Sequence, residues 1–116
     1  MARLSTHVLD TARGVPAAGV QIELAIVRSS GSETIARAVT NVNGRTDPPL
    51  LAGDRIEPGC YELTFHVGPY FRSAGPLADP PFFDVIVVRA GVADPNGDYH
   101  IPLLIAPYGY SVYRGA

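Results

Sequence analysis

The sequence predicts an all-β fold, a two-sheet β-sandwich of about eight short strands with one short helix. Glycine and proline are frequent, with 12 Gly and 11 Pro among 116 residues, which leaves little room for long helices. Several segments alternate apolar and polar residues, as half-buried strands do. Turn signals separate these segments at short intervals, a spacing typical of sandwiches.

The expected strands follow one another along the whole chain. Residues 20–29 show the clearest alternation, with Val20, Ile22 and Leu24 on one face. Residues 61–67 alternate in the same way and are followed by the expected helical turns. The expected strands are residues 4–9, 20–29, 34–40, 50–51, 61–67, 82–89, 99–105 and 110–113, and the helical turns are residues 68–74.

Two of the connections carry specific turn signals. The Asn43-Gly44 pair predicts a tight turn, because both residue types tolerate positive φ, and this turn introduces Arg45. The run Asp-Pro-Asn-Gly-Asp at residues 94–98 predicts a hairpin turn. We find no internal repeat and expect a single domain over residues 1–116.

Composition excludes several classes of function. A net charge of -2 gives no general attraction to nucleic acid or to an anionic membrane. All nine basic residues are Arg, which excludes lysine-amine chemistry. One cysteine, Cys60, and no metal-binding motif lead us to expect neither metal nor cofactor. The opening residues lack the pattern of a signal peptide, and no segment approaches the roughly 20 apolar residues of a membrane span, so we expect a cytoplasmic protein.

Residues 99–116 form an unusually apolar tail for a chain end. We expect this tail to be buried, either within its own sandwich or against another subunit. Arg114 lies within it, and a charged residue there suggests one wall of a small-molecule site. Arg45 offers a second guanidinium, although alone it would be interpreted as a surface arginine. Two such groups suit a planar, oxygen-rich, anionic ligand.

His7 and His100 lie in strands that are apolar on both sides. An imidazole there titrates near neutrality and suits general-base work. The alternative is a core histidine that hydrogen-bonds to a backbone carbonyl, and the pattern leaves both interpretations open. His66 shares the polar face of its strand with Glu62 and Thr64, so we expect it to be exposed and structural.

Three separated motifs resemble the transthyretin-like proteins and, within them, the 5-hydroxyisourate hydrolases. They are LSTHVLDTARGVPAAGVQIEL, TNVNGR and YHIPLLIAPYGYSVYRGA, and CYELTFHVGPYF adds a strand and short helix of that fold. The resemblance implies an eight-stranded, two-sheet sandwich whose subunits pair through edge strands. It also implies a homotetramer, a dimer of dimers, with the active sites at the dimer–dimer interface.

The resemblance also implies the site residues. The two histidines of the family's site fall on His7 and His100, and the arginine of its DGR turn falls on Arg45. The family's closing YRGS, implied to bind substrate, falls on Tyr113, Arg114, Gly115 and Ala116. Ala116 replaces the terminal serine, and its methyl group lacks a hydrogen bond worth about 0.5–1.5 kcal/mol. We therefore expect reduced rather than abolished activity.

The implied function is metal-free hydrolysis of 5-hydroxyisourate to 2-oxo-4-hydroxy-4-carboxy-5-ureidoimidazoline in urate catabolism. His7 and His100 would position and deprotonate the water, with His7 the first choice of base, and Arg45 would bind substrate oxygens. Ala116 keeps a second interpretation open, a non-catalytic transthyretin-like tetramer that binds a small aromatic ligand in its central channel. A third is a monomeric structural sandwich with solvent-exposed histidines.

Overall fold

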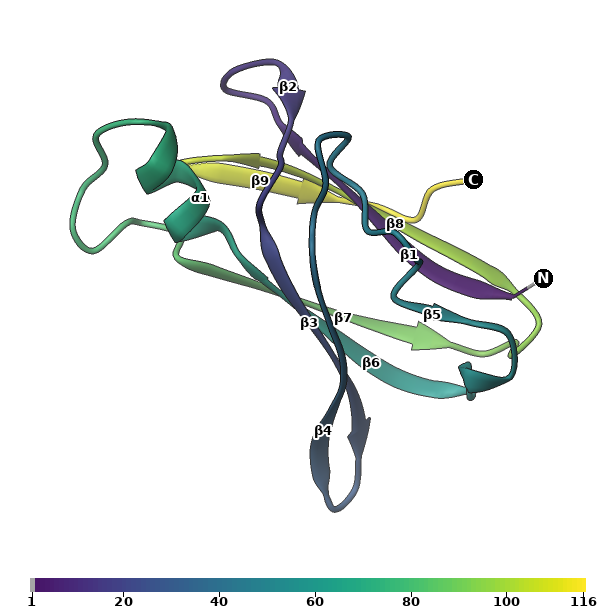
Figure 1. Ribbon diagram of the computed structural model, residues 1–116. Coiled ribbons are helices and arrows are strands. Elements are labelled where there is room, and N and C mark those ends of the chain that lie inside the picture. Colours follow the sequence, from purple (N-terminus) through teal and green to yellow (C-terminus); the bar gives the residue numbers. More distant parts are fainter. Residues whose placement is uncertain (1) are drawn as a thin grey trace.

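Two β-sheets stacked face to face form the framework of the computed structural model, which describes residues 2–116 (Figure 1). One sheet has the strand order β2-β1-β8-β9, with β5 also paired to β1, and the other has the order β4-β3-β6-β7. The elements are β1 (Arg3–Asp10), β2 (Val15–Pro16), β3 (Gln21–Arg28), β4 (Gly31–Val39), β5 (Leu51–Ala52), a 3-10 turn (Gly53–Arg55), β6 (Gly59–His66), α1 (Val67–Ala74), β7 (Val85–Val92), β8 (Asp98–Ala106) and β9 (Gly109–Val112).

The predicted sandwich and its short helix are confirmed. The predicted alternation matches the burial in each of the clearest strands, since residues of β3 and β6 point alternately inward and outward. The largest fully buried side chains include Tyr61 and Phe65 of β6. The strand β2, of only two residues, is the one strand that the sequence did not indicate.

A buried carboxylate ties the helix to the first strand. Asp10 at the end of β1 is 1% exposed. Its Oδ1 accepts hydrogen bonds from the backbone N–H groups of Ala12 and Arg13, both at 3.0 Å. Its Oδ2 accepts one from the Tyr70 hydroxyl of α1 at 2.8 Å. A buried charge is tolerated when hydrogen bonds satisfy it, so this cluster fixes the end of β1 without disturbing the apolar core.

The turn at residues 94–98 does not form the predicted hairpin. β7 and β8, which it joins, belong to different sheets. β8 instead pairs in parallel with β1 over their whole lengths, from Arg3↔Asp98 to Asp10↔Ile105 (Figure 1). β7 also begins at Val85, three residues later than expected. The turn signal at residues 94–98 was sound, but a local signal does not state which strand the chain joins next.

The C-terminal strand β9 lies at the edge of its sheet and is not buried within the single chain. Tyr110 is 44% exposed and Val112 39%.

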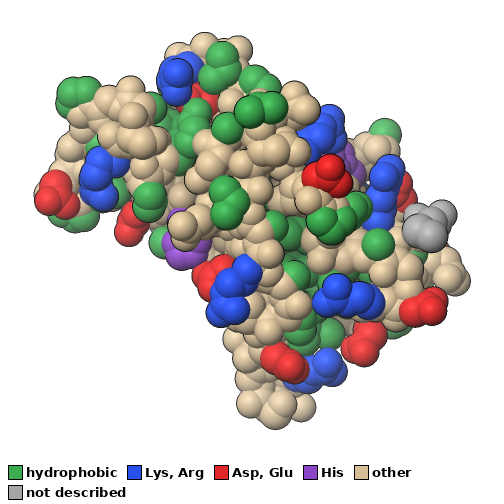
Figure 2. All heavy atoms as spheres, viewed as in Figure 1, with side chains coloured by type: hydrophobic (Ala, Val, Ile, Leu, Met, Phe, Trp, Pro, Cys, Tyr) green, Lys and Arg blue, Asp and Glu red, His purple; other side chains and the backbone are tan. Residues whose placement is uncertain are grey.

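On the face shown in Figure 2, basic and acidic side chains are interspersed among apolar ones. Within residues 2–116, no helix has the length and apolar character that a membrane crossing needs.

Candidate functional site

The parallel pairing of β1 with β8 brings the two ends of the sequence together. Ser5 lies opposite His100, and His7 lies opposite Pro102. Leu4, the neighbour of Ser5, points into the core. Because strand side chains alternate between faces, Ser5, His7 and His100 are half-buried on the outer face of this sheet.

The turn over residues 41–45 carries the arginine to the same face. The side-chain oxygen of Asn41 accepts the backbone N–H of Asn43 at 2.9 Å and that of Arg45 at 3.2 Å. Gly44 takes positive φ here, 75°, and its backbone N–H donates to the carbonyl of Asn41 at 2.9 Å, as expected of a tight turn. The backbone of Arg45 bridges that of His7, which places these two predicted site residues side by side.

The geometry around His7 determines which ring nitrogen carries its proton. Its Nε2 lies 2.8 Å from the backbone carbonyl oxygen of Asn43. A carbonyl oxygen only accepts hydrogen bonds, so Nε2 donates and carries the hydrogen. The neutral ring then keeps its lone pair on Nδ1. His7 thus hydrogen-bonds to a backbone carbonyl, as a purely structural histidine would. It also keeps a basic nitrogen, Nδ1, as a general base would.

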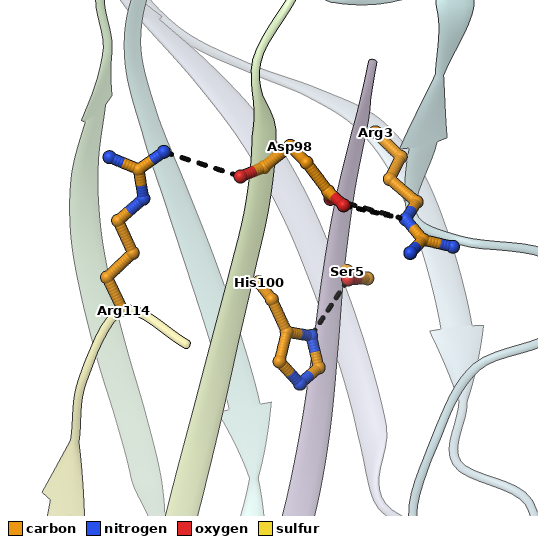
Figure 3. A network of polar contacts seen from close by, with 5 residues as sticks. All are labelled: Arg3, Ser5, Asp98, His100 and Arg114. Atoms are coloured by element: carbon orange, nitrogen blue, oxygen red, sulfur yellow. Dashed lines mark hydrogen bonds and ion pairs between the residues drawn. The ribbon is translucent and has the colours of Figure 1, made fainter. Parts of the chain in front are cut away.

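His100 is held by different partners. Its Nδ1 lies 2.9 Å from the Ser5 hydroxyl oxygen (Figure 3). Its backbone carbonyl accepts the N–H of Gly115 at 2.7 Å, which fastens the end of the chain to β8. Ser5 had no sequence signal of its own beyond lying two residues before His7 on the same strand face.

A cavity of about 390 Å³ opens beside His100. This volume lies in the range of small-molecule sites, about 300–1,000 Å³. The charged side chains of its wall are those of two arginines and one aspartate. The lining residues are Arg3, Ser5, Thr6, Arg45, Thr46, Pro49, Asp98, His100 and Ala116. Three of the predicted residues, Arg45, His100 and Ala116, therefore share one cavity, and His7 adjoins it through its backbone bridge to Arg45.

Burial and a neighbouring positive charge favour the neutral form of both histidines. Burial, followed by the positive charge of Arg45, lowers the pKa of His7, and the hydrogen bond to Asn43 only partly opposes this. Burial, then Arg45 and then His7, lower the pKa of His100. A neutral imidazole is the form that accepts a proton from water, so the site has the charge state that general-base hydrolysis needs.

Tyr113 and Arg114 lie away from this cavity. Figure 3 shows Arg114 on the other side of β8 from His100. Its Nη2 donates to the backbone carbonyl of Asp98 at 3.3 Å, and its guanidinium carbon lies 4.6 Å from the centre of the Tyr99 ring. Both residues line a separate, apolar cavity of about 300 Å³ between β7 and the tail. In the single chain, Tyr113 and Arg114 of the predicted tetrapeptide thus line one cavity and Ala116 lines the other.

Several residues of the site gave no usable sequence signal. Arg3 and Asp98 form an ion pair at 3.2 Å at the rim (Figure 3). Thr46 has the one side-chain polar atom that is buried without a hydrogen-bond partner among the described residues. Over residues 2–116, no group of three or more His, Cys, Asp or Glu side chains is placed to hold a metal ion.

Residues 4–115 match the model of the HIUase/Transthyretin family. A 5-hydroxyisourate hydrolase of Deinococcus radiodurans is 51% identical over 113 residues, which cover 97% of this chain and 95% of that protein. The structure of a Klebsiella pneumoniae 5-hydroxyisourate hydrolase is 36% identical, with a TM-score of 0.82, and the match covers 99% of this chain and 100% of that one. Transthyretin from Sparus aurata is 25% identical, with a TM-score of 0.89, over 99% and 97% of the two chains.

Proposed function

The chain belongs to the HIUase/Transthyretin family, and we propose that the cavity beside His100 is where it hydrolyses 5-hydroxyisourate. The activity is that of a hydrolase in urate breakdown, and the product is 2-oxo-4-hydroxy-4-carboxy-5-ureidoimidazoline. Relatives about half identical over nearly their full lengths are 5-hydroxyisourate hydrolases. The transthyretin structure shares only a quarter of its residues, so the non-catalytic carrier is not favoured.

One observation carries the assignment of the site: His7, Arg45 and His100, far apart in the sequence, gather on one face of the sandwich. His7 and Arg45 are bridged through their backbones, and Arg45 and His100 line one cavity. A base beside a fixed positive charge suits the attack of water on a carbonyl, because negative charge develops on the carbonyl oxygen.

In the proposed reaction, a water molecule adds to a ring carbonyl carbon and the adjoining C–N bond opens. Nδ1 of His7 takes the proton from that water, since its Nε2 is already engaged with Asn43. Arg45 binds substrate oxygens and stabilises the developing charge. No covalent intermediate, metal or cofactor is required. Ala116 lines the cavity and Gly115 packs against His100, and a substrate contact by any residue of the closing tetrapeptide stays a prediction from the resemblance.

We further propose that residues 1–116 form one domain and that the working assembly is a homotetramer with its sites between dimers. The exposure of the edge strand β9 and of the residue after it supports this, because Tyr110 and Val112 are 44% and 39% exposed in the single chain and Tyr113 is 57% exposed. An apolar sheet edge is a hazard unless another chain covers it. Such an assembly would also bring residues from two copies to each site. A cytoplasmic location stays a prediction from the sequence.

The direct test generates 5-hydroxyisourate from urate with urate oxidase and follows its ultraviolet absorbance with and without this protein. The protein should accelerate the decay well beyond the spontaneous rate across neutral pH. A matched rate would reject the hydrolase assignment. Retention of the compound on the protein without product would instead support the carrier alternative.

A further inference from the structure

Ser5 and His100 face each other across the parallel pair β1 and β8. Their backbones are directly in register, and the Ser5 Oγ lies 2.9 Å from His100 Nδ1 (Figure 3). Both side chains are half-buried, and both residues line the cavity that also contains Arg45. This hydroxyl therefore contacts one nitrogen of the imidazole at the edge of the proposed site.

The opposite edge of the imidazole is also held. The backbone N–H of Gly115 donates to the His100 carbonyl at 2.7 Å. A Cβ atom on residue 115 would lie only 2.7 Å from Cδ2 of His100, so the tail packs closely against the ring. With Ser5 on Nδ1 and Gly115 against Cδ2, the ring has little freedom to rotate. Nε2 is the nitrogen left for a ligand.

The two histidines of the site are thus anchored in opposite ways. His7 donates through Nε2 to the carbonyl of Asn43, which leaves Nδ1 as an acceptor. Hydrolysis of a cyclic amide requires one group to take a proton from water and another to deliver a proton to the departing nitrogen. With His7 committed to the first task, the second requires a hydrogen on Nε2 of His100.

We propose that Ser5 is a positioning residue, which donates its hydroxyl hydrogen to Nδ1 of His100 and so holds this imidazole as the tautomer with hydrogen on Nε2. The inference rests on the proposed hydrolase function and names the proton donor within it. The water proton passes to His7 Nδ1 as the new C–O bond forms. As the C–N bond breaks, Nε2–H of His100 gives its proton to the ring nitrogen, and in the same step the proton that His7 took from water passes through solvent to Nε2 of His100, so that neither an imidazolate nor an imidazolium is left.

The tautomer can be measured without substrate. Nitrogen-15 NMR of the ligand-free protein, at a pH where both histidines are neutral, distinguishes a protonated ring nitrogen from a bare one. For His100 we expect a bare Nδ1 and a protonated Nε2. A protonated Nδ1 in the wild-type protein would overturn the proposal. This readout needs no catalysis, so it is separate from the test of the hydrolase function itself.

Kinetics test whether the hydroxyl matters to turnover. Ser5→Thr keeps the hydroxyl. Ser5→Val places a side chain of almost the same shape as threonine there, without the hydroxyl. We expect Ser5→Val to lower kcat by about tenfold with little change in KM, since the loss of one hydrogen bond corresponds to roughly that factor. Ser5→Thr should restore kcat to within about twofold of wild type. An unchanged kcat in Ser5→Val would refute the positioning role.

Two further variants make these results interpretable. Ser32→Val, on the exposed strand β4 far from the cavity, is the matched control and should leave kcat unchanged. Ser5→Ala removes the hydroxyl with less bulk, and it replaces Ser5→Val in the comparison if that variant does not fold. A folded Ser5→Ala protein with wild-type kcat would count against the proposal in the same way.

Discussion

The backbone N–H of Val8 donates to the carbonyl oxygen of Gly44 over 2.8 Å, so the turn that carries Arg45 is fastened to the strand that carries His7. The next carbonyl back along the chain, that of Asn43, accepts Nε2 of His7. Two consecutive carbonyl groups of this turn are therefore used by two consecutive residues of β1. The position of Arg45 in the site depends on this attachment.

Gly44→Ala should loosen that attachment. Gly44 has φ 75°, and a Cβ atom there would collide with the carbonyl oxygen of Val8. Positive φ alone costs a residue with a Cβ about 1–3 kcal/mol, and the collision with Val8 adds to this, so we expect a larger loss of unfolding free energy than positive φ alone causes, together with a sharp fall in kcat. Urea unfolding at fixed protein concentration and the absorbance assay measure the two effects. Gly19→Ala is the matched control, because Gly19 has φ 84° with no atom near the added Cβ; equal losses in both variants would contradict the argument.

His7→Asn and His100→Asn should each lower kcat by roughly 10²-fold, because each removes a group that is proposed to transfer a proton. Circular dichroism should show that both variants keep the fold. His66→Asn is the control, since His66 Nε2 lies 2.9 Å from Glu23 on the other sheet. If both site variants turned over as fast as the control, the catalytic assignment would be wrong even for an active protein.

The acidic limb of the pH–rate profile should lie below the ordinary histidine pKa of about 6.5, because burial and Arg45 lower the pKa of both His7 and His100. Arg45→Gln removes one of these causes, so its limb should move to higher pH while its maximal rate falls. Arg45→Lys keeps the charge and should keep the limb near its original position. The measurement is the pH profile of kcat/KM for each variant. A limb that stays or moves to lower pH in Arg45→Gln would refute the effect of the Arg45 charge on the pKa of the histidines.

The same shifts affect stability with a definite sign. Because the folded pKa of each histidine lies below its unfolded value, the unfolded chain binds more protons between those two values. The free energy of unfolding should therefore decrease as the pH falls below about 6.5. Asn at both positions should weaken this dependence in urea titrations.

Ala116→Ser should raise kcat/KM. Ala116 lines the cavity beside His100, and a hydroxyl there adds one hydrogen bond worth about 0.5–1.5 kcal/mol, or roughly two- to tenfold. Ala106→Ser makes the same change at the far end of β8, outside that lining, and should have no such effect. A serine at residue 116 that left kcat/KM unchanged would show that this position makes no contact in the transition state.

Val112→Glu should weaken the proposed assembly. Val112 is 39% exposed on the edge strand β9, and a charge buried there against a second chain would be strongly unfavourable. Light scattering should show a smaller species than the wild-type protein at equal concentration. Val39→Glu, on the edge strand β4 of the other sheet, where Val39 is 57% exposed, should leave the mass unchanged. A full-size assembly in Val112→Glu would argue against an interface through β9.

The sequence predicted the elements well and the connections between them less well. Strand periodicity is a local property, so the alternation of β3 and β6 was visible residue by residue. The pairing of β1 with β8 joins residues 95 positions apart, and no local pattern encodes it. The hairpin expected at residues 94–98 failed for that reason, because the turn leads from one sheet to the other.

For the site, the motifs identified residues but did not indicate which cavity each side chain would line. The resemblance singled out His7, Arg45 and His100, which the fold gathers on one face. It did not separate Arg114 from Ala116, although the two lie in different cavities. Ser5 and the carbonyl of Asn43 escaped notice, because a hydroxyl and a backbone group become informative only when their partners are known.

The pairing of the first long strand with the last but one has a consequence for how the molecule matures. During synthesis, β1 leaves the ribosome early, but it cannot form its parallel pairing until β8 has also been made. Contacts this distant in sequence make folding slow, and a nascent or shortened chain has His7 without His100. Activity should therefore report on completed folding, because a chain interrupted before β8 lacks His100, one of the two proposed proton-transfer groups.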